Sequence, residues 1–295
     1  MLKRPHFINK KTDNQSPSRT APIPRFLLIL IDVSAPRPHI PGMKILLCND
    51  DGIHARGISV LHRSIGGLGD LHVVAPDTER SAAGHAITLT DPIKTLAVEK
   101  NDQLFGTAVS GTPADCIKLA LCLLHKDDLP DLVVSGINLG SNTGISVLYS
   151  GTVSAASEAV ILGVPGIAIS LCTYQNPHWD TAEKVAKEIV AKVLGNPLPD
   201  GTLLNVNIPN IPYSELKGMK AARMGRSRFV EKFSTHLDPR GNNYYWLDGE
   251  LDLLDDSPDT DVRVVDDGYV ALTPIHIDLT ATHAMEQVET WNAEY

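Results

Sequence analysis

Residues 43–52 read Met-Lys-Ile-Leu-Leu-Cys-Asn-Asp-Asp-Gly, so that an apolar run ends on two adjacent carboxylates, Asp50 and Asp51. Such a run followed by turn residues is typical of a buried strand, and open α/β sheets bind ligands where such strands end. Two neighbouring carboxylates repel each other, which raises their pKa values unless a cation lies between them. The pattern fits a site for Mg²⁺, Mn²⁺ or Ca²⁺, and it fits an Asx-rich turn before a helix equally well.

The composition is that of a globular, cytoplasmic protein. Of 295 residues, 43% are hydrophobic and 21% are charged, and no apolar stretch reaches the roughly 20 residues that span a bilayer. A net charge of −9 without a Lys/Arg cluster argues against binding of extended nucleic acid. The cysteines lie in apolar segments without Cys-x-x-Cys spacing, which predicts buried, reduced thiols; they are Cys48, Cys116, Cys122 and Cys172.

From Met43 onward, short apolar runs alternate with helical patterns, which predicts βαβ units and a mainly parallel sheet flanked by helices. Strands are expected at 44–48, 71–75, 131–135, 166–170 and 203–207. Helices are expected at 57–65, 113–124, 153–162 and 181–194. Thr112 and Asp115 have the spacing of a helix cap, so we assign them structural roles.

The two ends of the chain depart from this rhythm. Residues 1–42 mix Pro, Ser, Asn and basic residues, which indicates a disordered extension or an upstream start codon with Met43 as the working initiator. Residues 223–246 are polar and 248–267 are strongly acidic, and both are expected to form extended hairpins or arms. A half-buried strand at 269–274 and a terminal helix at 282–291 complete the expected elements.

Three further loops contain residue types that suit a metal and phosphate site. In residues 75–85, Ser81 offers a hydroxyl oxygen, and Arg80 or His85 is placed to face an anion. Residues 135–144 are rich in Gly and Asn, which suits close backbone approach to an anion and neutral oxygen ligation, and suits turns equally. Residues 149–153 lead into an Ala-rich helix whose amide groups favour phosphate.

Together these segments resemble the SurE (survival protein E) family of metal-dependent 5′/3′-nucleotidases. The resemblance runs almost continuously from Met43 to Ser170 and is looser in the last third. It is carried by the ordered motifs Asn49-Asp50-Asp51-Gly52, Ala75-Pro76-Asp77 with Arg80-Ser81, Ser110-Gly111-Thr112-Pro113-Ala114-Asp115-Cys116, Ser135-Gly136-Ile137-Asn138 and Tyr149-Ser150-Gly151-Thr152-Val153.

The resemblance implies a Rossmann-like α/β fold with a C-terminal swapped arm that forms a homodimer or homotetramer. It implies a single domain over 43–295, with a core at 43–222, the arm at 223–250 and a final strand and helix at 268–292. It also implies one divalent ion per subunit, Mg²⁺ or Mn²⁺. The implied metal ligands are Asp50, Asp51, Ser81 and Asn138; the implied phosphate contacts are Asn142, Ser150, Gly151 and Thr152, with Asn49 in support.

The expected reaction is hydrolysis of nucleoside 5′- and 3′-monophosphates to nucleoside and phosphate, with short polyphosphate as a side substrate. Asp50 is the candidate base for an in-line attack by a metal-oriented water, and its direct attack on phosphorus is the second variant. The alternative function is a non-catalytic nucleotide or phosphate sensor. A dinucleotide-dependent oxidoreductase is disfavoured, because no Gly-x-Gly-x-x-Gly fingerprint follows the first strand.

Overall fold

The computed structural model describes residues 42–291, and the predicted extension over 1–42 lies outside them except for Gly42. The elements follow in the order β1 (Lys44–Cys48), α1 (Arg56–Ile65), β2 (Asp70–Pro76), β3 (Thr95–Lys100), β4 (Gln103–Val109), α2 (Pro113–Leu119), η1 (Ala120–Leu124), β5 (Leu132–Leu139), η2 (Gly144–Leu148), α3 (Gly151–Ile161), β6 (Gly166–Cys172), α4 (Trp179–Gly195), β7 (Thr202–Pro209), η3 (Tyr213–Glu215), β8 (Met219–Ala221), β9 (Ser227–Leu237), β10 (Asn243–Leu253), α5 (Asp261–Asp266), β11 (Val270–His276), η4 (Thr282–Ala284) and α6 (Met285–Thr290).

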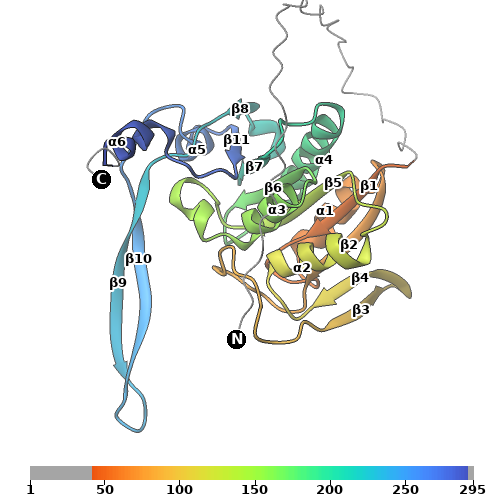
Figure 1. The fold of residues 1–295 in the computed structure, drawn as a ribbon, viewed down its shortest axis with the longest axis horizontal. Coiled ribbons are helices and arrows are strands. Elements are labelled where there is room, and N and C mark those ends of the chain that lie inside the picture. The colour runs from red at the N-terminus through yellow and green to blue at the C-terminus, as the bar shows by residue number, and fades with distance from the viewer. Residues whose placement is uncertain (1–41, 292–295) are drawn as a thin grey trace, which may run out of the picture. The chain divides into compact units, whose positions relative to one another are not determined.

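Within the described residues, nine strands form one sheet in the order β3-β4-β2-β1-β5-β6-β7-β11-β8 (Figure 1). The neighbours from β4 through β7 pair in parallel, whereas β3 and β11 run antiparallel to β4 and β7. The predicted α/β class with a mainly parallel sheet is therefore confirmed. None of the described helices combines the length and apolar character that a bilayer span requires.

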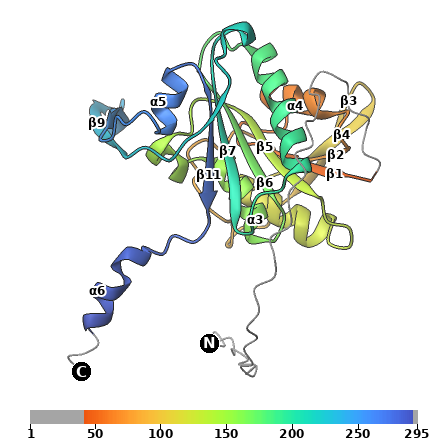
Figure 2. The ribbon, with the colours of Figure 1, turned by 90° about the horizontal axis from the view of Figure 1, so that it is seen from above.

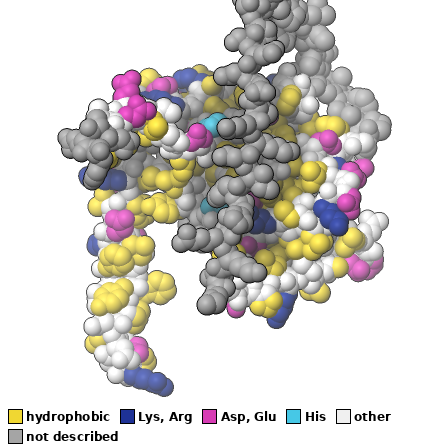
Figure 3. Space-filling view, in the orientation of Figure 1, with side chains coloured by type: hydrophobic (Ala, Val, Ile, Leu, Met, Phe, Trp, Pro, Cys, Tyr) yellow, Lys and Arg dark blue, Asp and Glu magenta, His cyan; other side chains and the backbone are white. Residues whose placement is uncertain are grey.

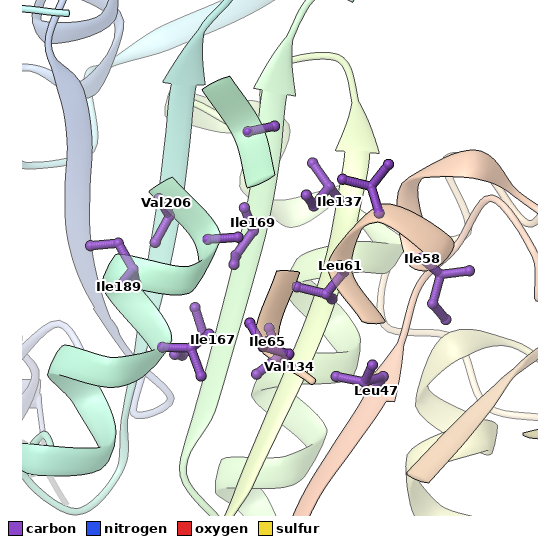
Figure 4. Packing of buried hydrophobic residues seen from close by; sticks show 14 of the residues in the cluster. Leu47, Ile58, Leu61, Ile65, Val134, Ile137, Ile167, Ile169, Ile189 and Val206 are labelled. Carbon is purple, nitrogen blue, oxygen red and sulfur yellow. The ribbon is translucent and has the colours of Figure 1, made fainter. Parts of the chain in front are cut away.

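The sheet is covered by helices on both faces, and α3 and α4 lie on opposite sides of it (Figure 2). Side chains along β1 point alternately to the two faces of the sheet, and both faces are apolar. Ile45 and Leu47 pack in one core, and Leu46 and Cys48 pack in the other. The first core joins the strands to α1 and α4; Figure 4 shows side chains such as Leu61 and Ile189 within it. The second core joins the strands to α2 and α3.

The connections place a topological switch point at the carboxyl ends of β1 and β5. The chain leaves β1 through α1 toward β2, and it leaves β5 through α3 toward β6 on the opposite face. Such crossovers are nearly always right-handed, so the two helices cover opposite faces and leave a switch point between their strands. The acidic turn at 49–52 and the end of β5 meet there.

Several boundaries differ from the sequence prediction. Strand β5 continues past Ser135 to Leu139 across a bulge, because Asn138 and Leu139 pair with β6; this part was expected to be a loop. The antiparallel pair β3–β4 and the short edge strand β8 were not predicted. The acidic stretch expected to be extended contains helix α5, which begins at a Thr260 cap.

The capping assignment is confirmed, since Thr112 and Asp115 form a reciprocal capping box at α2. The terminal helix is present as η4 followed by α6. All four cysteines are free as expected, but only Cys48 and Cys116 are buried. Cys172 is half-buried, and Cys122 is exposed.

Candidate functional site

The turn after β1 is closed by its own side chain. Asn49 Nδ2 donates to the carbonyl oxygen of Gly52 at 2.9 Å. Gly52 has φ +96°, a conformation that favours glycine, and a Cβ there would lie 3.2 Å from the carbonyl carbon of Thr78. The turn interpretation is therefore correct for Asn49 and Gly52, and it leaves the carboxylates of Asp50 and Asp51 available for another role.

Asp50 is buried against the start of α3. Its side chain is 5% exposed, and Thr152 Oγ1 donates to Asp50 Oδ1 at 2.5 Å. A Cβ on Gly151 would lie 2.7 Å from Asp50 Cβ, so glycine is needed for this close approach. Burial raises the pKa of the Asp50 carboxyl, and the hydrogen bond from Thr152 opposes that rise.

Asp51 is half-buried beside Asp50, and its pKa is raised as well. Burial, then the charge of Asp50, then that of Glu79 raise the pKa of Asp51 to about 7. Acids gathered without a counter-charge have such raised pKa values, and they mark functional sites more often than ordinary surface. A cation at this point would reverse the shift, because it favours the ionised carboxylates.

The segment that follows β2 is docked onto the acidic turn through its backbone. Ile53 N donates to Pro76 O at 2.8 Å, and Arg80 N donates to Asp50 O at 2.8 Å. Ser81 follows directly, so two loops separated by some 30 residues are fixed against each other. The predicted ligand Ser81 is thereby brought to the acidic pair.

Glu79 is a residue of this site that sequence reasoning missed. Ser81 Oγ donates to Glu79 Oε1 at 2.6 Å, and the charge of Glu79 raises the pKa values of both Asp50 and Asp51. The only signal in the sequence was an acidic residue two positions before Ser81, and surface loops contain many such residues.

Arg80 and His85, which were placed to face an anion, both have protein partners, although Arg80 Nε is buried without one. Arg80 Nη2 donates to Ser110 O at 3.1 Å and lies 3.5 Å from Asp77. His85 Nε2 lies 2.7 Å from Glu158 Oε2, a buried carboxylate on α3. These contacts fasten the Ser81 loop to its neighbours, so both side chains support the loop.

Asn138 lies at the end of β5, next to β1 in the sheet. Its Nδ2 donates to Gly140 O at 2.8 Å, which uses the amide nitrogen and not the oxygen. Because β5 pairs directly with β1 in parallel, Asn138 and the acidic turn lie at the same edge of the sheet. The amide oxygen is the donor atom that a hard cation requires.

The start of α3 brings the expected phosphate residues to the acidic pair. Ser150 is the N-cap, and its Oγ accepts from Val153 N at 3.1 Å. The first amide groups of an α-helix lack intrahelical acceptors, which suits an anion. Thr152 is fully buried, and both its hydroxyl and its backbone amide interact with Asp50, so the expected contacts of Ser150, Gly151 and Thr152 with phosphate stay predictions.

Asn142 lies in a buried polar network with residues of β6 and β7. Its Nδ2 donates to Ser170 Oγ at 2.8 Å, and its carbonyl oxygen accepts from the side chains of Asn205 and Asn207. Its side chain is therefore held by protein groups, and its expected contact with phosphate stays a prediction.

The assembled residues fit a hard divalent cation. Among residues 42–291, no three His, Cys, Asp or Glu side chains are grouped to hold a metal ion. The expected ligands are not such a group of three, because only two of them are carboxylates and the others are a hydroxyl and an amide oxygen. Asn49 Oδ1, next to the pair in the sequence, is a buried acceptor without a hydrogen-bond partner, and an added positive group would satisfy it.

Comparison with known proteins shows the family of this chain. A family model described as Survival protein SurE matches residues 45–231. The chain belongs to the SurE family. Similar SurE proteins include the 5′-nucleotidase SurE of Syntrophobacter fumaroxidans, 44% identical over 250 residues that cover 85% of this chain and 100% of that protein. That of Pelotomaculum thermopropionicum is 48% identical over 249 residues, covering 84% and 94%.

A solved SurE structure shares the fold. The crystal structure of the SurE protein from Aquifex aeolicus superposes with a TM-score of 0.74 at 40% identity. The match covers 84% of this chain and 99% of that one. The family resemblance expected from the ordered motifs is thus confirmed, including through the last third where the motifs are loose.

Proposed function

We propose that this protein is a phosphoric monoester hydrolase that converts nucleoside 5′-monophosphates to nucleoside and phosphate. The observation that carries the proposal is the contact between Asp50 and the start of α3, where the Thr152 hydroxyl donates to the buried carboxylate and a Cβ on Gly151 would lie 2.7 Å from Asp50 Cβ. The SurE relatives named 5′-nucleotidase support the substrate class. Nucleoside 3′-monophosphates and short polyphosphate present the same terminal phosphoryl group and are further substrates in this proposal.

We propose one divalent ion per subunit, Mg²⁺ or Mn²⁺, held by Asp50, Asp51, Ser81 and Asn138. The raised pKa values of the two acids and the unpartnered Asn49 Oδ1 support it. When bound, such an ion neutralises phosphate charge and eases ionisation of water.

The protein's own groups have separable roles in the hydrolysis. Asp50 accepts a proton from the attacking water, and Thr152 fixes its Oδ1 in place. The first amides of α3, among them that of Gly151, stabilise the charge that spreads over the phosphoryl oxygens as the bond to the leaving oxygen breaks. Ser150 holds these amides in position by capping the helix.

The test measures phosphate release from a panel of monophosphates by wild-type protein, Asp50→Ala and the control Asp127→Asn, which alters an exposed turn carboxylate. We expect Asp50→Ala to lose activity by about a thousandfold or more, because proton transfer and charge stabilisation each contribute factors of that order. Chelation should abolish activity, and Mg²⁺ or Mn²⁺ should restore it. Activity that survives chelation would contradict the proposal.

A non-catalytic nucleotide sensor is the second candidate, and the same panel separates it from an enzyme. A sensor would bind monophosphates in a metal-dependent manner and release no phosphate from any of them. The buried base and the oxygen-rich cation site together favour turnover, since binding alone does not need a positioned proton acceptor.

We also propose that the β9–β10 hairpin joins copies of the chain into a homodimer or homotetramer. The hairpin strands pair only with each other in the described residues, and hydrophobic side chains gather along them (Figure 3). An isolated two-stranded hairpin is marginally stable in water, so a partner surface is expected to cover it.

A further inference from the structure

The position of Glu79 is set by the backbone contacts of its loop with the acidic turn. The bonds from Ile53 N to Pro76 O and from Arg80 N to Asp50 O lie on either side of it. Gly52 allows the loop to approach so closely that a Cβ there would lie 3.5 Å from Glu79 N. The carboxylate therefore belongs to a fixed loop at the site, although its side chain is on the exposed side.

The hydroxyl of Ser81 has a single hydrogen, which it donates to Glu79 in a hydrogen bond. The Oγ–Oε1 distance of 2.6 Å is that of a charge-assisted bond, which is stronger than one between neutral groups. A hydroxyl that donates in this way keeps its lone pairs for another partner and gains electron density on its oxygen. It becomes a better ligand for a cation than a freely rotating serine.

Glu79 differs from the proposed ligands in that its Oε1 is already bonded to one of them, the Ser81 hydroxyl. Its negative charge lies on a loop that is bonded directly to the acidic turn, since Arg80 N donates to Asp50 O at 2.8 Å. Glu79 thus has two effects: it orients the Ser81 hydroxyl, and its negative charge attracts a positive ion over a longer distance.

We propose that Glu79 is a positioning residue of the cation site, which orients and polarises the Ser81 hydroxyl and adds the negative charge that favours a divalent ion. The proposal rests on the metal site of the proposed function. Partners outside the ligand set commonly change metal affinity by about 10-fold to 100-fold.

The test titrates metal-free protein with Mn²⁺ and measures free Mn²⁺ by electron paramagnetic resonance. The proteins are wild type, Glu79→Gln, Ser81→Ala, the double variant, Asp51→Asn and the control Glu99→Gln, which removes an exposed charge from β3. We expect Glu79→Gln to weaken binding by about 10-fold or more, and to have a smaller effect in the Ser81→Ala background. Glu99→Gln should match wild type.

A second measurement separates this role from a merely structural one. Without metal at pH 8, Glu79→Gln should raise the melting temperature because it removes repulsion, whereas loss of a structural contact would lower it. Wild-type affinity in Glu79→Gln, with binding lost in Asp51→Asn, would overturn the role of Glu79 and leave the metal site intact. Absence of Mn²⁺ binding in wild type would overturn the metal site and this proposal together.

Discussion

At the scale of single residues, the site is organised around an unfavourable contact between acids. Asp51 is ordinarily expected to titrate near 3.8, yet burial and the charges of Asp50 and Glu79 raise its pKa to about 7. Between these two values the folded chain holds more protons than the unfolded chain does. The contribution of Asp51 to folding stability therefore falls as the pH rises through that window in metal-free protein.

This raised pKa predicts that cation binding releases more protons in acid than in base. At pH 6 Asp51 must lose a proton before it binds a cation, whereas at pH 8.5 it is already ionised, so we expect about one proton more per ion at pH 6 than at pH 8.5. Calorimetric titration with Mn²⁺ in buffers of different ionisation enthalpy measures the number. Equal release at both pH values would show that Asp51 is already ionised before binding.

Part of this residue-scale picture was visible in the sequence. The Asn49–Gly52 turn and the capping box of Thr112 and Asp115 depend on neighbours within four positions, so local spacing predicts them. The bond from Ser81 to Glu79 is equally local, but its importance comes from the acidic pair of another loop. Sequence spacing carries no information about that encounter.

At the scale of elements, the end of β1 and the start of α3 are fitted to each other. Gly151 makes the fit possible, because a Cβ there would lie 2.7 Å from Asp50 Cβ and 3.2 Å from Pro113 Cγ. The helix N-terminus can thus approach the carboxylate directly. The same approach fixes the position of the amides proposed to bind phosphate.

Substitution Gly151→Ala should therefore displace Asp50. Alanine usually stabilises a helix, but overpacking here is expected to cost about 1–3 kcal/mol and to reduce phosphate release by about a hundredfold. The matched control is Gly195→Ala at the end of α4, where a Cβ meets nothing within 4 Å and stability should rise by up to about 1 kcal/mol. Urea unfolding and phosphate release measure both effects, and normal activity in Gly151→Ala would contradict the close fit.

At the scale of the whole molecule, the two faces of the hairpin β9–β10 differ: one carries mainly apolar side chains, and the other mixes charged side chains with exposed Val230, Tyr244 and Trp246. Cross-strand pairs on one side are Phe229 with Leu251 and Phe233 with Leu247. The neighbouring register on the other side carries charge, as in the ion pair between Arg228 and Asp252. The apolar side chains are exposed in the single chain, which favours burial against another copy.

A charge on the apolar face should separate the copies. We expect Phe233→Asp to lower the mass measured by light scattering during size-exclusion chromatography, because burying a carboxylate in an apolar interface is costly. Lys232→Gln on the other face, an exposed position opposite Asp248, is the control and should retain the assembly. A wild-type mass in Phe233→Asp would place the interface elsewhere.

The sequence by itself determined the α/β class, the main strands and helices, and the family, because alternating apolar runs, caps and ordered motifs are local properties. Tertiary structure alone decided that β5 extends to Asn138, that Arg80 and His85 have protein partners, and that Glu79 lies beside the acidic pair. These outcomes depend on strand pairing and on loops that meet at the carboxyl ends of β1 and β5. Contacts between distant segments follow from packing the entire sheet, which local spacing does not specify.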